Sequence, residues 1–289
     1  MKRTQPAWLD TKLFPFESKW IDVDGETLHY VDEGQGQVIL FAHGTPEWSF
    51  GYRELIRSFR PHYRCIAIDM LGFGLSEKKT NADYTCQAHA VRLEKIIGKL
   101  QLKNIAIVAN DFGGSIAMSY AIRHPENIHA IILFNTWMWS LKHDKHFTAP
   151  VKTINSWFGR TMYLTFNAPV NLIMPMAFGK RERLTREIHA HYKKALQQGE
   201  RTAAYAFAKE LMNASDWWQE LWEKADLLKG KKMLFFWGLK DKFVLPKELE
   251  KWRSKFPDAK VISFEDAGHF VQEEKAGQMV SAIYSLLRD

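Results

Sequence analysis

The sequence has few cysteines and no long apolar run. Its 289 residues include two cysteines, Cys65 and Cys86. Because no apolar run follows the charged start MKRTQPAWLD, we expect no export signal and two free thiols in a reducing, cytoplasmic compartment. No stretch approaches the roughly 18 consecutive apolar residues of a membrane span, which argues against an integral membrane protein.

A strong charge of one sign is also lacking. Lysine and arginine number 40 against 33 aspartates and glutamates, an excess of 7 that we expect to be spread along the chain. Without a long basic block, no nucleic-acid partner is expected. The mixed charge around the tryptophans between Trp137 and Trp237 also disfavours docking on a membrane. A composition of 46% hydrophobic and 25% charged residues, without internal repeats, is typical of globular proteins.

Short, continuous apolar runs alternate with segments of helical periodicity. The runs are Val38–His43, Cys65–Met70, Ile105–Asn110, Ala130–Asn135, Met233–Gly238 and Val261–Asp266. Continuous apolarity indicates strands covered on both faces, as in a parallel sheet under helices. A probable hairpin formed by residues 20–24 and 26–34 precedes them. The pattern predicts an α/β fold with a mostly parallel, twisted sheet covered by helices.

One interval interrupts this alternation. Nearly 100 residues separate Asn135 from Met233 without a clear strand, which is too long for a structureless loop in a compact domain. We predict an inserted helical lid, or cap, at residues 136–213, with residues 1–135 and 214–289 forming the core domain. The lid is expected over the carboxyl edge of the sheet, where open α/β sheets place their sites.

The stretch VANDFGGSIAMSYA places an aspartate where a buried strand turns into a helix. Ala109, Asp111 and Gly113 fit the small-x-nucleophile-x-small pattern of a nucleophile elbow, in which small neighbours allow a tight, strained turn. A helix N-cap is the alternative for Asp111. As a nucleophile, an ionised carboxylate can attack a saturated electrophilic carbon directly and form an ester.

Two further strand ends supply partners for Asp111. His269 follows the last predicted strand and is expected to be the base that activates water against the ester. Asp241 follows the penultimate strand and is expected to orient His269 and stabilise its charged form. The backbone N–H groups of Thr45 and Phe112 are expected to form the oxyanion site.

Metal and nucleotide sites are not expected. The histidine pairs in HDKH and HAH lack a third ligand at a convincing spacing; they are His143 and His146, and His189 and His191. LGFGLSEK has Glu77 in place of the third glycine of a dinucleotide fingerprint. We therefore predict chemistry without a metal or cofactor.

The segments HGTPEWSF, RCIAIDMLGFGLSEK, ANDFGG, WGLKD and DAGHF, in this order, resemble the haloalkane dehalogenase and epoxide hydrolase branch of the α/β-hydrolase superfamily over nearly the whole chain. The resemblance implies an α/β-hydrolase fold with the triad Asp111, Asp241 and His269. It implies a hydrolase that converts a small apolar haloalkane and water into an alcohol and halide. A homo-oligomer is left open.

The sequence departs from the dehalogenase pattern at two positions. Dehalogenases usually carry tryptophan after the nucleophile and a donor such as asparagine after His-Gly; this chain has Phe112 and Thr45. We expect Thr45 and Phe112 at the leaving-group end, and Asn135 and Trp137 in contact with substrate. Trp137 and Trp139 are candidates for the missing indole donor, although packing within the lid is the favoured explanation of both tryptophans.

Two alternatives remain. An epoxide hydrolase is suggested by the segment Thr45–Glu47, and its lid tyrosines would be sought among Tyr163, Tyr192 and Tyr205. An ester or lactone substrate is a smaller option within the same chemistry. A non-catalytic small-molecule-binding protein with this fold is the second alternative, which the complete triad disfavours.

Overall fold

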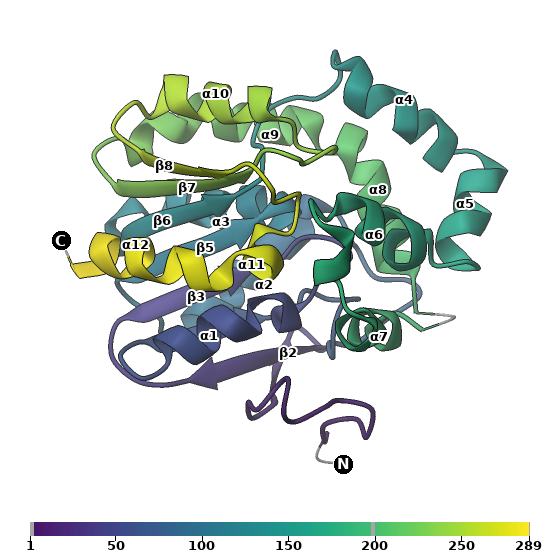
Figure 1. Cartoon of the computed structure of the whole chain (residues 1–289), viewed down its shortest axis with the longest axis horizontal. Helices are drawn as coiled ribbons and strands as arrows, with labels where there is room; N and C mark the ends of the chain where they lie inside the picture. The colour runs from purple at the N-terminus through teal and green to yellow at the C-terminus, as the bar shows by residue number, and fades with distance from the viewer. Residues whose placement is uncertain (1–2, 198–199, 289) are drawn as a thin grey trace.

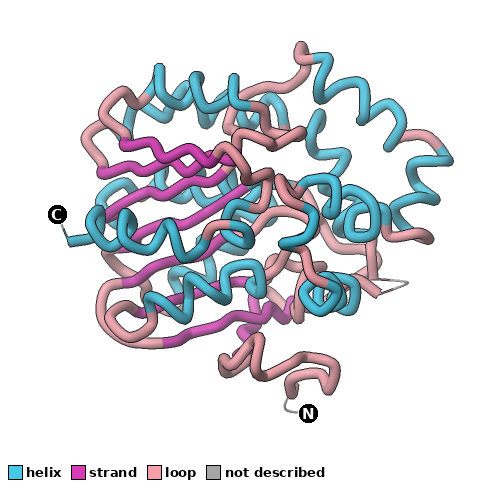
Figure 2. The backbone as a smooth tube through the Cα atoms, viewed as in Figure 1, coloured by secondary structure: helices cyan, strands magenta, loops and turns pink. Residues whose placement is uncertain are grey.

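Eight strands form one twisted, mostly parallel sheet (Figures 1 and 2). The computed structural model describes residues 3–197 and 200–288. The order is β1-β2-β4-β3-β5-β6-β7-β8, with β1–β2 and β2–β4 antiparallel and every later pair parallel. The strands are β1 Lys19–Val23, β2 Glu26–Glu33, β3 Val38–Ala42, β4 Arg64–Ile68, β5 Ile105–Asn110, β6 Ile128–Phe134, β7 Lys232–Gly238 and β8 Lys260–Phe264.

Helices cover both faces of this sheet, as the continuous apolar runs require. In Figure 1, α1 (Arg53–Phe59), α11 (Val271–Glu274) and α12 (Ala276–Arg288) lie in front of the sheet. Behind it lie α2 (Cys86–Lys99), α3 (Asp111–Arg123) and α9 (Ser215–Lys224), and α10 (Pro246–Lys255) packs on β7. Every residue of the central strands β3 and β5 is buried. The edge strand β8 is half exposed, so its apolar run is covered less fully than we expected.

The segment between β6 and β7 is helical, as predicted, and covers the carboxyl ends of the strands (Figure 1). Within residues 136–213 its elements are α4 Lys145–Ile154, α5 Trp157–Leu164, the π-helix η3 Pro169–Ile173, α6 Met174–Ala177, the 3-10 turn η4 Arg181–Arg183, α7 Arg186–Ala195 and α8 Thr202–Asn213; α9 and the 3-10 turn η5 Ala225–Leu228 follow before β7. α8 packs on α4 and α5. The domain boundaries at 136 and 213 stay a prediction.

The turn from β5 into α3 holds a strained residue. Asp111 is the first residue of α3 and has a φ of 49°, a conformation that residues other than glycine seldom adopt. A Cβ atom on Gly113 would lie 2.3 Å from the carbonyl oxygen of Ala42 and 2.4 Å from that of His43. Glycine is therefore needed at 113 so that α3 can start against the end of β3, which explains the elbow pattern of the sequence.

Both cysteines are buried and free, as expected. Burial raises the pKa of each thiol, because a thiolate is poorly solvated there. Within the described residues, no helix is long and apolar enough to cross a membrane.

Candidate active site

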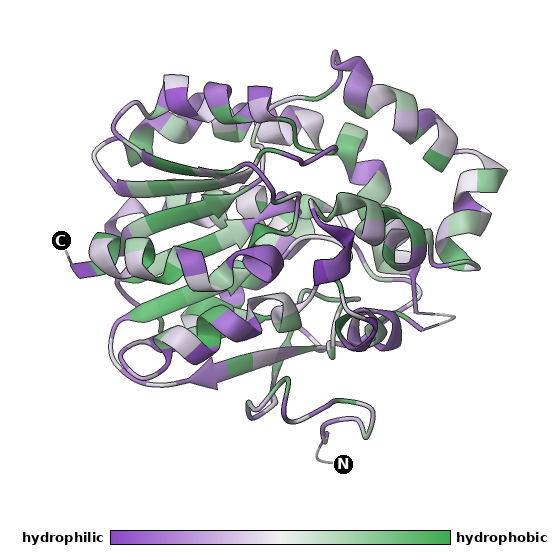
Figure 3. Ribbon diagram, viewed as in Figure 1, coloured by the Kyte–Doolittle hydropathy of each residue, from purple (hydrophilic) through white to green (hydrophobic). Residues whose placement is uncertain are grey.

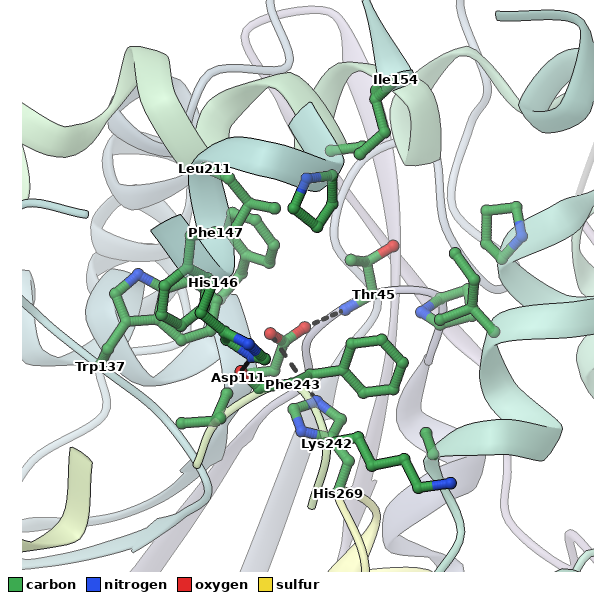
Figure 4. Close-up of a pocket in the computed structure, with 18 of the residues that line it drawn as sticks. Thr45, Asp111, Trp137, His146, Phe147, Ile154, Leu211, Lys242, Phe243 and His269 are labelled. Carbon is green, nitrogen blue, oxygen red and sulfur yellow. Dashed lines mark hydrogen bonds and ion pairs between the residues drawn. The ribbon is translucent and has the colours of Figure 1, made fainter. Parts of the chain in front are cut away.

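A cavity of about 300 Å³ lies between the carboxyl edge of the sheet and the lid (Figure 4). Its wall is mostly apolar and comes from both regions. The polar side chains in the wall are Thr45, Asp111, His146, Tyr163, Lys242 and His269. Of these, Lys242 extends away from Asp111 in Figure 4. The cavity therefore suits a small apolar molecule, and it presents to that molecule the carboxylate of Asp111 with the imidazole of His269 beside it.

Asp111 is buried at the floor of this cavity. Its Oδ2 accepts a hydrogen bond of 2.8 Å from the backbone N–H of Thr45, and the N–H of Phe112 also bonds to the carboxylate. Burial raises the pKa of Asp111, although His269 and the two N–H groups act in the opposite direction. The Thr45 N–H holds Oδ2, and Oδ1 lies on the side of His269.

His269 lies between two aspartates. Its Nδ1 is 2.7 Å from Oδ2 of Asp241. Its Nε2 is 3.8 Å from Oδ1 of Asp111 (Figure 4). Burial lowers the pKa of His269, but the charges of Asp241 and Asp111 outweigh it and raise the pKa to about 9. The imidazole is therefore protonated at neutral pH while Asp111 carries its charge.

Asn135 does not line the cavity, although we expected it to contact substrate. It is fully buried behind the triad, where its Nδ2 donates to Oδ2 of Asp241 at 2.8 Å and its Oδ1 accepts from the N–H of Gly238 at 2.9 Å. Both ends of the amide are thus occupied by β7 and the loop that follows it. Asn135 therefore positions Asp241 and does not contact substrate. The reason is the register of β6 beside β7, which pairs Phe134 with Phe236 and so places Asn135 next to the end of β7.

Thr45, Phe112 and Trp137 all line the cavity, as we expected. The Thr45 hydroxyl has no hydrogen-bond partner among the described residues. Phe112 packs edge-on against Trp137 with ring centroids 5.1 Å apart. The Trp137 indole N–H is enclosed and also lacks a described partner, so Trp137 stays a candidate for the missing indole donor. Trp139 lies outside the cavity, packed on Trp222 and Trp252.

The three lid tyrosines have different environments. Tyr163 lines the cavity, and both burial and the charge of Asp111 raise its pKa. The Tyr205 hydroxyl donates to the carbonyl of Ile154 at 3.3 Å. The Tyr192 hydroxyl bonds to Glu273, outside the cavity. Of the three, Tyr163 alone lines the cavity.

Sequence reasoning missed the role of Glu47. This buried carboxylate accepts from Asn110 at 2.5 Å and from Gln272 at 2.6 Å. Asn110 directly precedes Asp111, and Gln272 lies three residues after His269. Burial raises the pKa of Glu47 to about 8 despite the hydrogen bond from Asn110. Glu47 therefore connects the turn that carries Asp111 to the loop that carries His269 through two hydrogen bonds. The only sequence feature that pointed to this role was an acidic residue beside a loop proline.

Three of the four histidines in the HDKH and HAH segments, His146, His189 and His191, bind backbone groups. His146 Nε2 is 3.0 Å from the carbonyl of Phe243, and His189 Nε2 is 2.7 Å from that of Val170. His191 is 2.9 Å from the carbonyl of Glu187. Across residues 3–197 and 200–288 there is no cluster of three histidine, cysteine or acidic side chains arranged to hold a metal.

Comparisons with known proteins agree with the geometry. Residues 37–276 match the model of the alpha/beta hydrolase fold family. Haloalkane dehalogenase 2 of Mycobacterium tuberculosis H37Rv is 32% identical over 286 residues, which cover 95% of this chain and 96% of the relative. The cis-3-alkyl-4-alkyloxetan-2-one decarboxylase of Shewanella oneidensis is 33% identical and covers 95% and 89%.

An epoxide hydrolase is matched only in part. Epoxide hydrolase 1 of Caenorhabditis elegans is 30% identical over 154 residues, which span 52% of this chain and 37% of the relative. Among solved structures, haloalkane dehalogenase DbeA from Bradyrhizobium elkani has a TM-score of 0.85 at 21% identity and covers 94% of this chain and 98% of its own, which supports the fold. The chain belongs to the α/β-hydrolase fold family, in the branch of its haloalkane dehalogenase relatives.

Proposed function

We propose that the protein is a haloalkane dehalogenase-like hydrolase that works through an ester on Asp111. The observation that carries this proposal is the carboxylate of Asp111 at the apex of a strained turn, facing an apolar cavity and 3.8 Å from an imidazole that Asp241 holds at 2.7 Å. A serine elbow would suit acyl transfer, whereas a buried carboxylate suits attack on a saturated carbon.

In the first half-reaction, Oδ1 of Asp111 attacks the carbon that bears the leaving group. The new O–C bond forms as the carbon–halogen bond breaks, and the halide departs with the bonding pair. Oδ2 keeps its hydrogen bond from the N–H of Thr45, and the N–H of Phe112 also stays on the carboxylate. Since the side chain of Phe112 has no donor, the unpartnered hydroxyl of Thr45 and the unpartnered indole N–H of Trp137 are the cavity-lining groups that could bind the departing halide.

In the second half-reaction, His269 acts as the base. Ester formation removes the negative charge of Asp111, which is one of the charges that raise the pKa of His269. The imidazole can then lose its proton to solvent, accept one from water and direct the hydroxide at Cγ of Asp111. The N–H groups of Thr45 and Phe112 stabilise the tetrahedral oxyanion until the Cγ–O bond to the alkyl group breaks, and the departing alkoxide takes the proton from His269 and leaves as the alcohol. The water oxygen remains in the Asp111 carboxylate.

A single turnover in heavy-oxygen water tests this route. Enzyme in excess over a short bromoalkane should carry the label in the peptide that contains Asp111, and the first alcohol released should be unlabelled. Labelled alcohol with unlabelled Asp111 would show direct attack by water and overturn the proposal. His269→Gln should accumulate the alkyl ester as added mass on Asp111, and normal turnover by this variant would contradict the assigned base.

A substrate whose leaving atom is oxygen is the second candidate. Tyr163 lines the cavity and can donate to an opening epoxide, and the Shewanella relative is named for an oxetanone substrate. Bromide release, diol formation from styrene oxide and alkene formation from a cis-3-alkyl-4-alkyloxetan-2-one separate these activities. A non-catalytic binding protein would give none of the three products. We also propose a cytoplasmic location, which the two free thiols support.

A further inference from the structure

The excess positive charge of the protein belongs entirely to the lid. Residues 136–213 hold 12 lysines and arginines against 5 acidic residues, out of 40 and 33 in the chain. The rest of the chain therefore holds 28 of each and has no formal net charge. Our expectation that the excess is spread along the chain was wrong, because it counted the whole chain together.

The outer part of the lid is basic without acidic neighbours in sequence. Residues 145–181 include five lysines and arginines and no aspartate or glutamate. Among the described residues, no carboxylate oxygen lies within 4.0 Å of the charged nitrogen atoms of Lys145, Lys152 or Arg160. The side chains of Lys152 and Arg160 are exposed. Their charges are thus available to an external anionic surface. Our expectation against membrane docking considered the mixed charge of the whole stretch from Trp137 to Trp237 and overlooked this segment, which has no acidic residue.

The same segment exposes large apolar side chains. Of the large apolar residues that are exposed in the described chain, five lie on the lid within residues 157–176, and two, Val91 and Leu227, lie on the core. The five and their exposed fractions are Trp157 79%, Phe158 58%, Phe166 59%, Leu172 51% and Met176 50%. They belong to α5, η3, α6 and the turn between α5 and η3, at the right-hand end of the molecule in Figure 3.

The lid is one layer thick at this place. Tyr163, Pro169 and Ile173 lie on α5 and η3 and line the cavity from the inside. The elements that expose Trp157 and Leu172 to solvent therefore also form the roof over Asp111. Apolar ligands on the outside would be separated from the cavity by a single layer of side chains.

We propose that the outer face of the lid, Trp157, Phe158, Phe166, Leu172 and Met176, docks on an anionic lipid surface. Aromatic side chains are favourable at the boundary between headgroups and acyl chains, and lysine and arginine are attracted to anionic headgroups. A second copy of the chain fits less well, because a two-fold interface would bring this basic segment against itself.

Vesicle flotation tests the proposal with the full-length protein. Vesicles of equal phosphatidylglycerol and phosphatidylcholine should carry the protein upward, whereas pure phosphatidylcholine vesicles should carry at least about tenfold less. Raising NaCl to roughly 0.5 M should weaken the binding, because salt screens exposed charges. Trp157→Ala/Phe158→Ala and, separately, Lys152→Glu/Arg160→Glu should each lower the bound fraction about tenfold or more.

Matched changes on the core serve as controls. Val91→Ala/Leu227→Ala removes exposed apolar side chains, and Lys99→Glu/Lys103→Glu reverses exposed charges, so both should float like the parent. Circular dichroism checks that each variant is folded. Equal flotation of lid and core variants would overturn the proposal, and so would no binding to anionic vesicles. Self-association that disappears in Trp157→Ala/Phe158→Ala would assign this face to a second copy instead.

Discussion

The sheet core and the lid differ in what they contribute to one cavity. The core supplies Asp111, Asp241 and His269 from loops at strand ends, held by fully buried hydrogen bonds. The lid supplies apolar wall and the entire net charge of the chain. We infer from this difference that the core determines the reaction chemistry. The lid would determine which substrate sizes fit and where the protein is located. Substitutions in the two regions should therefore have different effects.

The largest effect is expected in the core at Asp111. Asp111→Asn keeps the shape of the side chain, and asparagine tolerates the positive φ, but the amide is a poor nucleophile. Turnover of a bromoalkane should fall by about 10⁴-fold. The thermal midpoint should change little, which separates lost chemistry from lost folding. Retention of more than a tenth of the activity would indicate that Asp111 is not the nucleophile.

Glu47 should affect stability in a pH-dependent way. Its pKa of about 8 lies above that of an unfolded glutamate, so the folded state binds the proton more tightly. The stability from this group is complete below about pH 4.5 and is lost as the pH rises through 8. Between pH 5 and 9 the free energy of unfolding of the parent should fall by about 4 kcal/mol relative to Glu47→Gln.

Denaturant titrations across this pH range measure that difference. The activity of Glu47→Gln supplies a second readout, since the charge of Glu47 also raises the pKa of His269. The acid limb of the pH–kcat profile should move to lower pH in the variant. Parallel stability curves would show that Glu47 does not titrate in the folded protein.

Asn135 should have an intermediate effect. Asn135→Ala removes the 2.8 Å hydrogen bond to Asp241 and leaves the triad otherwise intact. We expect kcat to fall about 10- to 100-fold with little change in KM, because the imidazole loses its orientation and no substrate contact is removed. Asn127→Ala, on a distant turn, is the control. An increase in KM alone would instead favour a substrate-binding role.

The smallest effect is expected in the lid. Ile173 lines the cavity from the lid, so Ile173→Ala enlarges the cavity and leaves the triad unchanged. KM should change by a few-fold and longer bromoalkanes should gain relative to shorter ones, while kcat for the best substrate stays within about twofold. A loss of kcat as large as that of Asn135→Ala would show that the lid also positions reacting groups.

The sequence predicted the core better than the lid and the positioning groups. Continuous apolar runs located β3 to β8, because strands covered on both faces leave little freedom of composition. Steric demands at the elbow similarly identified Asp111 and Gly113. Glu47 is separated along the chain from Asn110 by 63 positions and from Gln272 by 225 positions. No local sequence pattern encodes contacts between residues so far apart.

Asn135 shows a different reason for failure. An asparagine at the end of β6 can point either at substrate or at a neighbouring loop. The position of β7 beside β6 determines which of the two it contacts. The lid helices were predicted as a class, but which face of each lines the cavity depends on how they pack together.

The first hydroxyl of the insertion anchors it to the reactive turn. Thr136 Oγ1 donates to the carbonyl oxygen of Asp111 at 2.6 Å, and the N–H of Asp111 donates to the carbonyl of Asn135 at 3.2 Å. Chimeric proteins that exchange cap segments within this fold should therefore retain positions 135 and 136 from the recipient. A chimera joined after residue 136 should acquire the substrate selectivity of the donor lid and keep the backbone contacts that position the Asp111 carboxylate.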